Sequence, residues 1–419
     1  MITISARNAH QALPEVLHQL KTRGVRRDSR NGPVLVFPVP VCIGYEKPLE
    51  RVVFCPERDA NPFFHFFEAL WMLAGRNDVE PLAYYAKQVR EYSDDGKTFN
   101  GAYGYRWRDA EVGDSRDPGG KDCQVDQLDL IVNHLKADPN SRRAVLQMWN
   151  VEDDLLKIGC KSMNPRNPPQ SEGEYMALVE GVKVHDPGSK DVCCNLSVMF
   201  SIRKECVTLP DYDDRSDGYY ERCLDITVTN RSNDLVWGCL GANYVHFSFL
   251  QEYMAARLGV EVGRYHHFTN NLHVYDWNWK PEEWLADETP DFYTDFSLSE
   301  VDMPEEWVLQ RWGKSLAKVP LIKDPVQFEK ELIGFAEDFW GSPDRIEGRG
   351  QESHAPLTEP FLADVVLPML LAFGHWKEHK NGDEALGHLK NVAADDWRIA
   401  GENWIRRRIE RRNRNETMV

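Results

Sequence analysis

The amino-acid sequence predicts an α/β protein followed by a mostly helical C-terminal extension. Up to about residue 276, short runs rich in β-branched and aromatic residues alternate with segments of helical period. Beyond that point the chain is tryptophan-rich and acidic and shows no evident strand. Since 419 residues is long for one domain, we expect a main domain over residues 1–285 and a helical extension over residues 286–419.

A strand and a buried helix are predicted near the N-terminus. Residues 34–43 form a β-rich run, and Pro38 and Pro40 place it near a sheet edge or a bulge. Residues 61–75 are typical of a capped helix that ends at glycine and is apolar on nearly every face. Glu68 lies inside this helix, where a carboxylate is costly unless it has a function.

The middle of the chain predicts two more helices and three strands. Helical periods cover residues 125–138 and 243–258, the second of which is stopped by a glycine. Apolar runs at 144–149, 192–202 and 224–228 predict the strands. These elements complete the predicted α/β region.

The remaining segments are predicted as surface loops and extension helices. Residues 110–121 and 159–190 are polar and rich in glycine or proline, which is typical of loops. In the extension, residues 361–375 and 394–412 favour helix. The arginine cluster at 406–408 is interpreted as the solvated face of a helix end and not as a nucleic-acid site.

Charge and cysteine content exclude several function classes. A formal net charge of -17 and a pI near 5.3 argue against broad electrostatic binding to nucleic acid or anionic membrane. Nine cysteines, mostly in apolar segments, indicate reduced thiols. Neither a signal peptide nor a run of about 20 apolar residues is evident. We therefore expect a cytoplasmic protein that binds no nucleic acid and no membrane.

A polar stretch at residues 231–234, Arg-Ser-Asn-Asp, closes an apolar run. Buried strands favour β-branched and aromatic side chains, so this succession of a base, a hydroxyl, an amide and a carboxylate indicates a site for a polar anionic ligand. Cys194 stands upstream, and residues 273–275, His-Val-Tyr, stand downstream. Together these residues suggest a nucleophile, a group that binds an anion and a group that binds a hydroxyl of the ligand.

The order and spacing of these motifs resemble thymidylate synthase and its relatives, the deoxynucleotide hydroxymethylases. The resemblance implies a large mixed sheet with helices, a homodimer, and no metal. It also implies transfer of a one-carbon unit from 5,10-methylene-tetrahydrofolate to C5 of a deoxypyrimidine monophosphate, in the host cytoplasm if a phage encodes the protein. The matching segments are Arg30-Asn31-Gly32, Glu68 to Gly75, Tyr103 to Arg108, Asp126-Gln127, Asp138 to Arg143, Trp149-Asn150, Cys194, residues 231–234, Asn243 and His273 to Tyr275.

The resemblance assigns the nucleophile to Cys194. A thiolate that adds to C6 of a pyrimidine makes C5 nucleophilic, and later elimination restores the ring. By spacing alone Cys193 and Cys194 are nearly equal candidates, because either fits as a small buried strand residue. Phe200 follows Cys194 at the interval that the family shows, which favours Cys194. Nearby arginines would stabilise its thiolate.

Phosphate binding is expected from arginines, whose planar fork suits phosphate oxygens. The resemblance implies that Arg231 and Ser232 form the clamp within one subunit. It implies that Arg142 and Arg143 reach into the neighbouring subunit's site and that Arg30 lies on a mobile loop closing over the phosphate. Without the matching context, the adjacent arginines would be interpreted as a solvated strand end.

The resemblance also assigns proton transfer and folate binding. Glu68 would organise water and proton transfers at O4 and C5, and Tyr103 would assist proton abstraction from C5. Without the resemblance, Glu68 would be interpreted as a partly exposed helix glutamate paired with an arginine. Tyr103 would be interpreted as an aromatic core residue. Asp234 is assigned both to the catalytic residues and to binding of the pterin ring. Gly238 and Trp71 are also expected to bind the folate.

Asn243 is predicted to select the base. An amide donates to O4 and accepts from N3–H of uracil, whereas cytosine-specific relatives have aspartate, so dUMP is favoured over dCMP. One residue more than the family pattern separates Gly238 from Asn243, so the amide could be displaced. His273 and Tyr275 would hold the sugar 3′-hydroxyl.

Several departures from the family pattern bear on the product. Asn195 and Met199 replace a histidine and a glutamine, so hydrogen bonding at the base is expected to differ. Residues 89–92 lack the tryptophan that shields the transferred methylene, and its loss favours attack by water and hence 5-hydroxymethyl-dUMP. The short closing tail of the family has no counterpart, and we expect the extension to seal the pocket instead.

Alternative functions remain open at this point. They are a thymidylate synthase that makes dTMP and dihydrofolate, a dCMP methylase or hydroxymethylase, and a non-catalytic nucleotide-binding relative. Binding alone needs no thiolate, so Cys194, Glu68 and Tyr103 argue against the last. After residue 276 no phosphate-binding glycine loop or metal-spaced cluster is found, so the extension is predicted to be structural or partner-binding.

Overall fold

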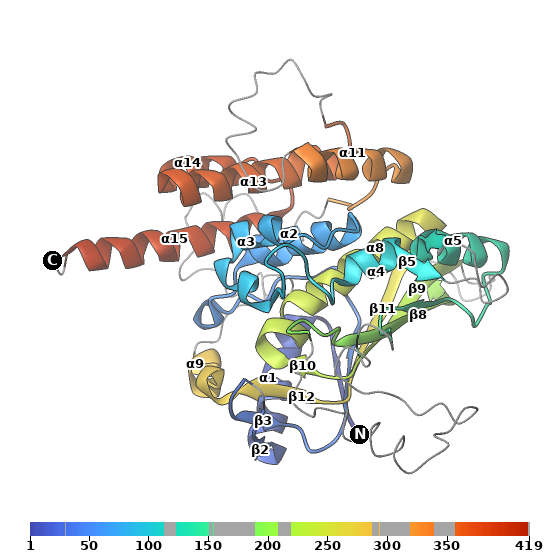
Figure 1. Cartoon of the computed structure of the whole chain (residues 1–419), viewed down its shortest axis with the longest axis horizontal. Helices are drawn as coiled ribbons and strands as arrows, with labels where there is room; N and C mark the ends of the chain where they lie inside the picture. Colours follow the sequence, from blue (N-terminus) through green and yellow to red (C-terminus); the bar gives the residue numbers. More distant parts are fainter. Residues whose placement is uncertain are drawn as a thin grey trace, which may run out of the picture.

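A six-stranded mixed sheet forms the centre of the molecule (Figure 1), with the strand order β1-β4-β11-β9-β8-β7. The computed structural model describes residues 1–29, 31–112, 123–150, 154, 189–207, 219–286, 293, 319–338 and 357–417. The strands of this sheet are β1 (Ile2–Ala6), β4 (Val41–Tyr45), β7 (Val145–Gln147), β8 (Asn195–Val207), β9 (Tyr219–Asn230) and β11 (Glu261–Thr269).

A second, four-stranded sheet has the order β10-β12-β3-β2. Its strands are β2 (Val25–Arg27), β3 (Val34–Val36), β10 (Asn233–Asp234) and β12 (Leu272–Tyr275), and a separate pair is formed by β5 (Ala110–Val112) and β6 (Cys123–Val125). β10 runs parallel to β12, with Asp234 opposite His273. This register brings two segments that carry predicted site residues side by side.

The predicted strand over residues 34–43 is two strands in different sheets. β3 pairs with β12 and β2, whereas β4 pairs with β1 and β11. Pro38 and Pro40 lie between them and lack the amide hydrogen that a continuous ladder needs. The prediction of β structure here is confirmed, but the prolines end one strand and start another.

Two buried helices lie between the sheet and the extension. α2 packs on α8, and α8 packs on β9 and β11. Asn61 caps α2 by accepting from Phe64 N (3.2 Å), and Gly259 ends α8 in the left-handed conformation (φ 69°), as the sequence predicts. The helices of the main region are α1 (Ala9–Arg23), α2 (Pro62–Leu73), α3 (Val79–Tyr85), α4 (Tyr103–Arg108), α5 (Gln127–Ala137), α8 (Ala242–Leu258) and α9 (Pro281–Ala286), with short turns η1 (Pro56–Arg58), η2 (Lys87–Tyr92), η4 (Leu235–Cys239) and η5 (Asp276–Asn278).

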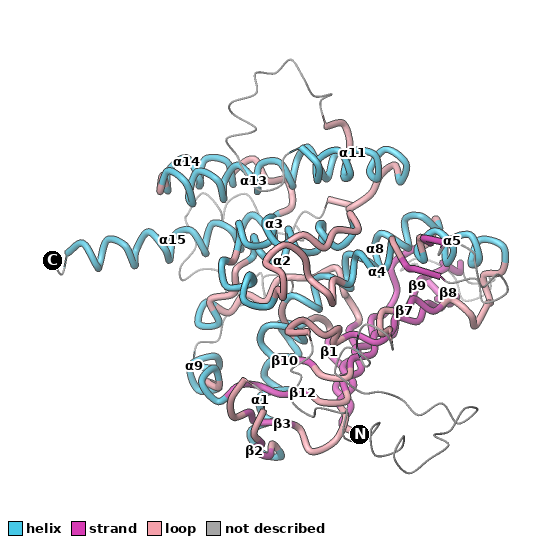
Figure 2. Tube along the Cα trace, in the orientation of Figure 1, coloured by secondary structure: helices cyan, strands magenta, loops and turns pink. Residues whose placement is uncertain are grey.

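The described part of the extension is helical, as predicted (Figure 2). Its elements are α11 (Pro325–Asp338), η6 (Leu362–Val366), α13 (Leu367–Gly374), η7 (His375–His379), α14 (Gly382–Leu389) and α15 (Asp395–Thr417). Aromatic rings join it to α2: Phe63 contacts Trp404 edge to face at 5.5 Å, and Phe66 contacts Trp397 at 4.9 Å. The extension therefore buries the face of α2 that an isolated main domain would expose.

The arginine cluster of α15 is not simply a solvated helix face. Arg408 pairs with Asp59, and Arg407 and Arg411 lie 3.5 and 2.7 Å from the same carboxylate. This corrects the interpretation of residues 406–408, because two of the three arginines are used to dock α15 beside η1.

No helix within the described ranges is long and apolar enough to cross a membrane.

Candidate active site

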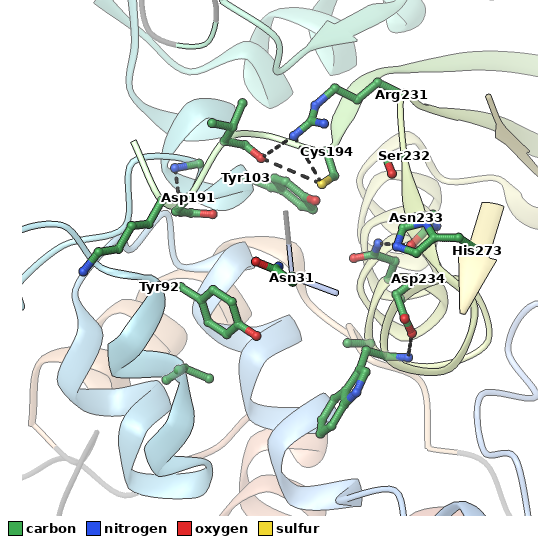
Figure 3. Close-up of a pocket in the computed structure, with 18 of the residues that line it drawn as sticks. Asn31, Tyr92, Tyr103, Asp191, Cys194, Arg231, Ser232, Asn233, Asp234 and His273 are labelled. Atoms are coloured by element: carbon green, nitrogen blue, oxygen red, sulfur yellow. Dashed lines mark hydrogen bonds between the residues drawn. The ribbon is translucent and has the colours of Figure 1, made fainter. Parts of the chain in front are cut away.

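A cavity of about 970 Å³ lies where the ends of the strands meet α2 and α8. This volume is at the upper end for small-molecule pockets and leaves room for two substrates. Figure 3 shows the polar side chains that point into it. The predicted site residues that line it are Cys194, Glu68, Tyr103, Asp234, Arg231, Ser232, Asn243, His273, Tyr275, Gly238 and Trp71.

Two predicted site residues do not line this cavity, and the position of a third is not described. Arg30 lies outside the described residues. Arg142 and Arg143 are exposed, in the turn between α5 and β7, and do not line the cavity of their own chain. A role in the site would therefore require a second subunit.

Cys194 and Arg231 are brought together by a strand pair. β8 begins just after Cys194 and β9 ends just before Arg231, and the two strands are antiparallel, with Asn195 opposite Asn230. Arg231 N consequently donates to Cys194 O (3.0 Å), and Arg231 Nη2 lies 3.6 Å from Cys194 Sγ (Figure 3). A guanidinium at this position favours the thiolate form of Cys194.

Arg231 also fixes the chain leading to the cysteine. Its Nε donates to Cys193 O (2.9 Å) and its Nη2 to Val192 O (3.0 Å). The side chain thus orients the segment before β8 as well as presenting positive charge to the cavity.

The two neighbouring cysteines differ in environment. Cys193 is 1% exposed, donates to Asn195 O (3.0 Å) and does not line the cavity, and burial raises its pKa far above the usual value. Cys194 is partly exposed and faces the cavity. Access therefore separates two residues that spacing left nearly equal.

Asp234 is held so that one carboxylate oxygen stays available. Its Oδ1 accepts from the backbone N–H groups of Val236 (2.7 Å) and Trp237 (2.6 Å). Its Oδ2 is buried without a hydrogen-bond partner in the described part of the chain, and burial raises the pKa of Asp234. A buried acceptor of this kind fits a ring N–H donor such as the pterin of a folate.

A π-helical turn accommodates the extra residue before Asn243. Leu240 N donates to Leu235 O (3.0 Å) in η4, an i→i+5 hydrogen bond that takes one residue more than an α-turn. Asn243 therefore still lines the cavity despite the extra residue. Arg58 stabilises this turn by donating to Val236 O (2.7 Å) and Leu240 O (2.9 Å).

Gly238 is required by the close approach of two amides. Asn243 Nδ2 donates to Asn233 Oδ1 (3.0 Å), and a Cβ at Gly238 would collide with that oxygen. The glycine therefore holds the Asn233 and Asn243 pair in place at the cavity wall.

Glu68, Trp71 and Tyr103 line the helical side of the cavity. Trp71 is almost fully buried and its indole N–H lies 3.2 Å from both Asp78 O and Asp78 Oδ1. Tyr103 stacks on Phe247 with 6.0 Å between ring centroids, and burial raises its pKa well above the usual value. Tyr103 is thus a neutral phenol that can donate a hydrogen bond.

The residues predicted to bind the sugar hydroxyl lie on the side of the cavity that is formed by strands. His273 and Tyr275 are two residues apart on β12, so their side chains share one face, and their rings are in edge contact at 5.4 Å. Ser232 lies next to them through Asn271 O, 3.4 Å from its Oγ. Hydroxyl and imidazole groups thus line the same cavity as Arg231.

His246 is a cavity residue that the sequence analysis missed. It lies on α8, three residues after Asn243, and its Nε2 is 2.9 Å from Glu68 Oε2. The signal available in the sequence was this spacing, because residues three apart share one helix face. Asp191 and Lys190, on the segment before Cys194, also line the cavity and were not predicted.

Val89 lines the cavity in the stretch where the resemblance leads one to expect an indole. It lies on η2 with Tyr92, which also lines the cavity and is 52% exposed. By contrast, Asn195 is buried and donates to Asn230 (2.7 Å), and Met199 is exposed. Neither of these last two residues lines the cavity.

The expectation that the extension seals the pocket is wrong for its described part. No described residue beyond Trp277 lines the cavity. The extension instead packs on α2 from the side that carries Phe63 and Phe66. Over the same described ranges, no group of three or more histidine, cysteine, aspartate or glutamate side chains is arranged to hold a metal ion.

Comparison with known proteins agrees with this fold and site. The thymidylate synthase family model matches residues 58–165 and 175–305, and these ranges contain Glu68, Cys194 and Asn243. The cysteine, the arginine and the mixed sheet are thus those of a folate-dependent enzyme class that modifies C5 of pyrimidine nucleotides. The chain belongs to the thymidylate synthase family.

Three relatives show the range of similarity. The deoxyuridylate hydroxymethyltransferase of Pseudomonas phage M6 is 40% identical over 97% of this chain and 95% of its own length. The deoxyuridylate hydroxymethyltransferase of Bacillus phage SP01 is 36% identical over 56% of this chain and 49% of its own. The thymidylate synthase of Streptococcus sanguinis is 27% identical over 44% of this chain and 51% of its own.

Proposed function

We propose that this enzyme transfers a one-carbon unit from 5,10-methylene-tetrahydrofolate to C5 of dUMP and adds water, giving 5-hydroxymethyl-dUMP. The observation that carries the choice of product is Val89, which faces the cavity where a shielding indole is expected in a methyl-forming enzyme. The near full-length similarity to a phage deoxyuridylate hydroxymethyltransferase supports the same choice.

Cys194 starts the reaction in this proposal. Its thiolate, stabilised by Arg231 at 3.6 Å, adds to C6 of the pyrimidine, and the electron pair released toward C5 and O4 makes C5 nucleophilic. After C5 has bonded to the one-carbon unit, the C5 proton is removed with Tyr103 assisting. The bond between the one-carbon unit and the folate nitrogen then breaks, so that tetrahydrofolate leaves and a methylene remains joined to C5 by a double bond. Water then adds to the one-carbon unit, and elimination of Cys194 restores the ring.

Substrate binding is divided between the two sides of the cavity. Arg231 and Ser232 hold the phosphate and His273 and Tyr275 hold the sugar, all from strand ends. Asn243 reads the base: its amide donates once to Asn233 and keeps one N–H and its carbonyl oxygen for O4 and N3–H of uracil.

The folate is placed beside the turn η4. Asp234 Oδ2, which has no partner in the described part of the chain, would accept from a pterin ring N–H. Gly238 and Trp71 line the same cavity and would contact the ring system. The chemistry that the folate supplies is the one-carbon unit.

A homodimer would complete the phosphate site. Arg142 and Arg143 are exposed next to β7, and β7 pairs with β8 so that Val145 lies opposite Met199. These two apolar side chains are 44% and 40% exposed. An apolar sheet face flanked by arginines suits a second copy of the chain, into whose site the arginines would reach.

The extension, taken as residues 286–419, is proposed as a second unit that supports α2. Its rings pack on Phe63 and Phe66, which are on the helix that carries Glu68 and Trp71. We place the enzyme in the cytoplasm, where a reduced Cys194 is maintained.

Product analysis tests the proposed function. The full-length chain is incubated with dUMP and methylene-tetrahydrofolate, and the nucleotide is identified by mass spectrometry. We expect 5-hydroxymethyl-dUMP and no dihydrofolate. A methyl product with dihydrofolate would establish the thymidylate synthase alternative, and faster turnover of dCMP would overturn the choice of base.

Release of tritium from C5-labelled dUMP provides a second measurement. It reports C5 chemistry whatever the final product is. A non-catalytic nucleotide-binding protein would bind dUMP without releasing tritium.

A further inference from the structure

His246 has the features of a functional residue and not of a core histidine. It is 2% exposed, yet its side chain lines the cavity from the same face of α8 as Asn243. α8 packs directly on α2 (Figure 1). Glu68, on α2, consequently lies on the same cavity wall.

The polar atoms of His246 and Glu68 lie close to each other, but their hydrogen-bonding capacity is not filled. His246 Nε2 and Glu68 Oε2 are 2.9 Å apart without the alignment of a hydrogen bond. Neither atom, nor His246 Nδ1, has a hydrogen-bond partner in the described part of the chain. Buried polar groups are normally paired, so two such groups on one cavity wall indicate a polar ligand beside them, on the cavity side.

Two other buried histidines show the contrast. Burial lowers the pKa of His65 and of His267 to about 3, so both are neutral. Neither lines the cavity, and His267 is occupied by Asn233 Nδ2 and Tyr265 OH, each at 3.1 Å. His246 differs because it faces the cavity beside a carboxylate.

We propose that His246 and Glu68 together hold the water that adds to the one-carbon unit. This inference rests on the proposed hydroxymethylation of dUMP and names the groups that carry out its last step. A carboxylate accepts hydrogen bonds, and an imidazole offers a donor and an acceptor, so the pair can orient a water oxygen and take up its proton.

The step balances without a reductant. While Cys194 is bonded to C6, the one-carbon unit is a methylene joined to C5 by a double bond and conjugated with the C4 carbonyl. The water oxygen bonds to the methylene carbon, the electron pair of the double bond moves toward O4, and the water proton passes to the pair. The returning electron pair forms C5=C6 and expels the Cys194 thiolate.

The test separates methylene formation from the addition of water. The full-length chain and its His246→Ser and His246→Gln variants are assayed with C5-tritiated dUMP and methylene-tetrahydrofolate, with and without 2-mercaptoethanol as a competing nucleophile. Tritium release measures methylene formation, and mass spectrometry measures the shares of hydroxymethyl, thioether and methyl products.

We expect His246→Ser to keep tritium release within about threefold while the hydroxymethyl share falls at least about tenfold, since acid-base groups contribute factors of this size or larger. The thioether product or dTMP should replace the lost hydroxymethyl product. His246→Gln should recover part of the hydroxymethyl share, because an amide also has a donor and an acceptor.

His65→Gln is the matched control. It alters a buried histidine on α2, the helix that carries Glu68, but one that does not line the cavity. We expect its product ratio to equal that of the unmodified enzyme, and thermal melting should show whether each variant is folded.

Three results would overturn the inference. An unchanged product ratio in His246→Ser removes the role in water addition. Loss of tritium release from a folded His246→Ser variant assigns the residue to an earlier step. A raised KM for dUMP with an unchanged ratio assigns it to base binding. In contrast, formation of dTMP and dihydrofolate by the unmodified enzyme contradicts the proposed function itself.

Discussion

The strand side and the helix side of the cavity are built differently. On the strand side, Cys194, Arg231 and Asp234 are fixed by backbone hydrogen bonds at the ends of paired strands. On the helix side, Glu68 and His246 project from packed helices with polar atoms that have no hydrogen-bond partner in the described residues.

This difference suggests a division of labour. Register between strands determines where the nucleophile and the anion-binding groups lie, and a change there should stop the reaction. The helices determine which molecule meets the activated one-carbon unit, and a change there should redirect the reaction. The predictions below test that division, beginning with the largest expected effect.

Cys194→Ala should lower turnover by about 10⁴-fold or more, because no other described thiol lines the cavity. It should also abolish the covalent adduct with fluoro-dUMP, measured by mass spectrometry. Cys193→Ala is the control, and it should retain the adduct. Retained turnover in Cys194→Ala would show that Cys194 is not the nucleophile. It would also contradict the proposed division of roles between the strand side and the helix side.

Asn243→Asp should lower the preference for dUMP over dCMP by about 100-fold, since a site that hydrogen-bonds one base rejects a base with inverted donors and acceptors. In the unmodified enzyme, Asn233 Oδ1 accepts a hydrogen bond from the Asn243 amide at 3.0 Å. In the variant a carboxylate would face this oxygen without a donor, so binding of dUMP should weaken as well. The measurement is kcat/KM for both nucleotides, and an unchanged ratio would show that another group reads the base.

Val89→Trp should raise the methyl share of the product by about tenfold by shielding the one-carbon unit from water. The product ratio is measured by mass spectrometry at equal tritium release. Glu91→Trp, on the same element but at a position that does not line the cavity, should leave the ratio unchanged. Equal ratios in both variants would show that the helix side does not control the outcome.

Asp234→Asn should raise thermal stability at pH 8 by roughly 2 °C. Burial raises the pKa of Asp234, so folding disfavours the charged carboxylate, and stability falls as pH rises through that pKa. Below about pH 4 the protonated carboxyl resembles the amide, and the two melting temperatures should converge.

Asp225→Asn is the control for the charge effect. Asp225 is paired with Arg203 (2.7 Å), so this variant should melt lower at pH 8. A higher melting temperature for Asp225→Asn, or a lower one for Asp234→Asn, would contradict the account of buried charge.

Local sequence signals predicted most elements because their causes are local. The helix over 61–75 was recognisable from its Asn61 cap and apolar run, and the helix over 243–258 from the glycine that ends it. The run over 34–43 was recognisable as β structure, but its division between two sheets was not, because one partner of each strand, β12 or β11, lies more than two hundred residues away.

The sequence by itself determined the family and most of the cavity. Cys194, Arg231 and Asp234 stand in motifs whose residue types follow from the chemistry of nucleotide and folate binding. Their order along the chain was enough to place them in one site. The interpretation of 406–408 as solvated failed, because Asp59, the partner of Arg407 and Arg408, is distant in sequence.

Only the tertiary structure decided which atoms face the cavity. Cys193 and Cys194 are nearly equal candidates by spacing, but the chain just before β8 buries the first and exposes the second to the cavity. The π-turn η4 returned Asn243 to the cavity despite an inserted residue, and the packing of α8 on α2 brought His246 to Glu68. These outcomes depend on helical phase and on contacts between distant segments, which sequence spacing alone does not specify.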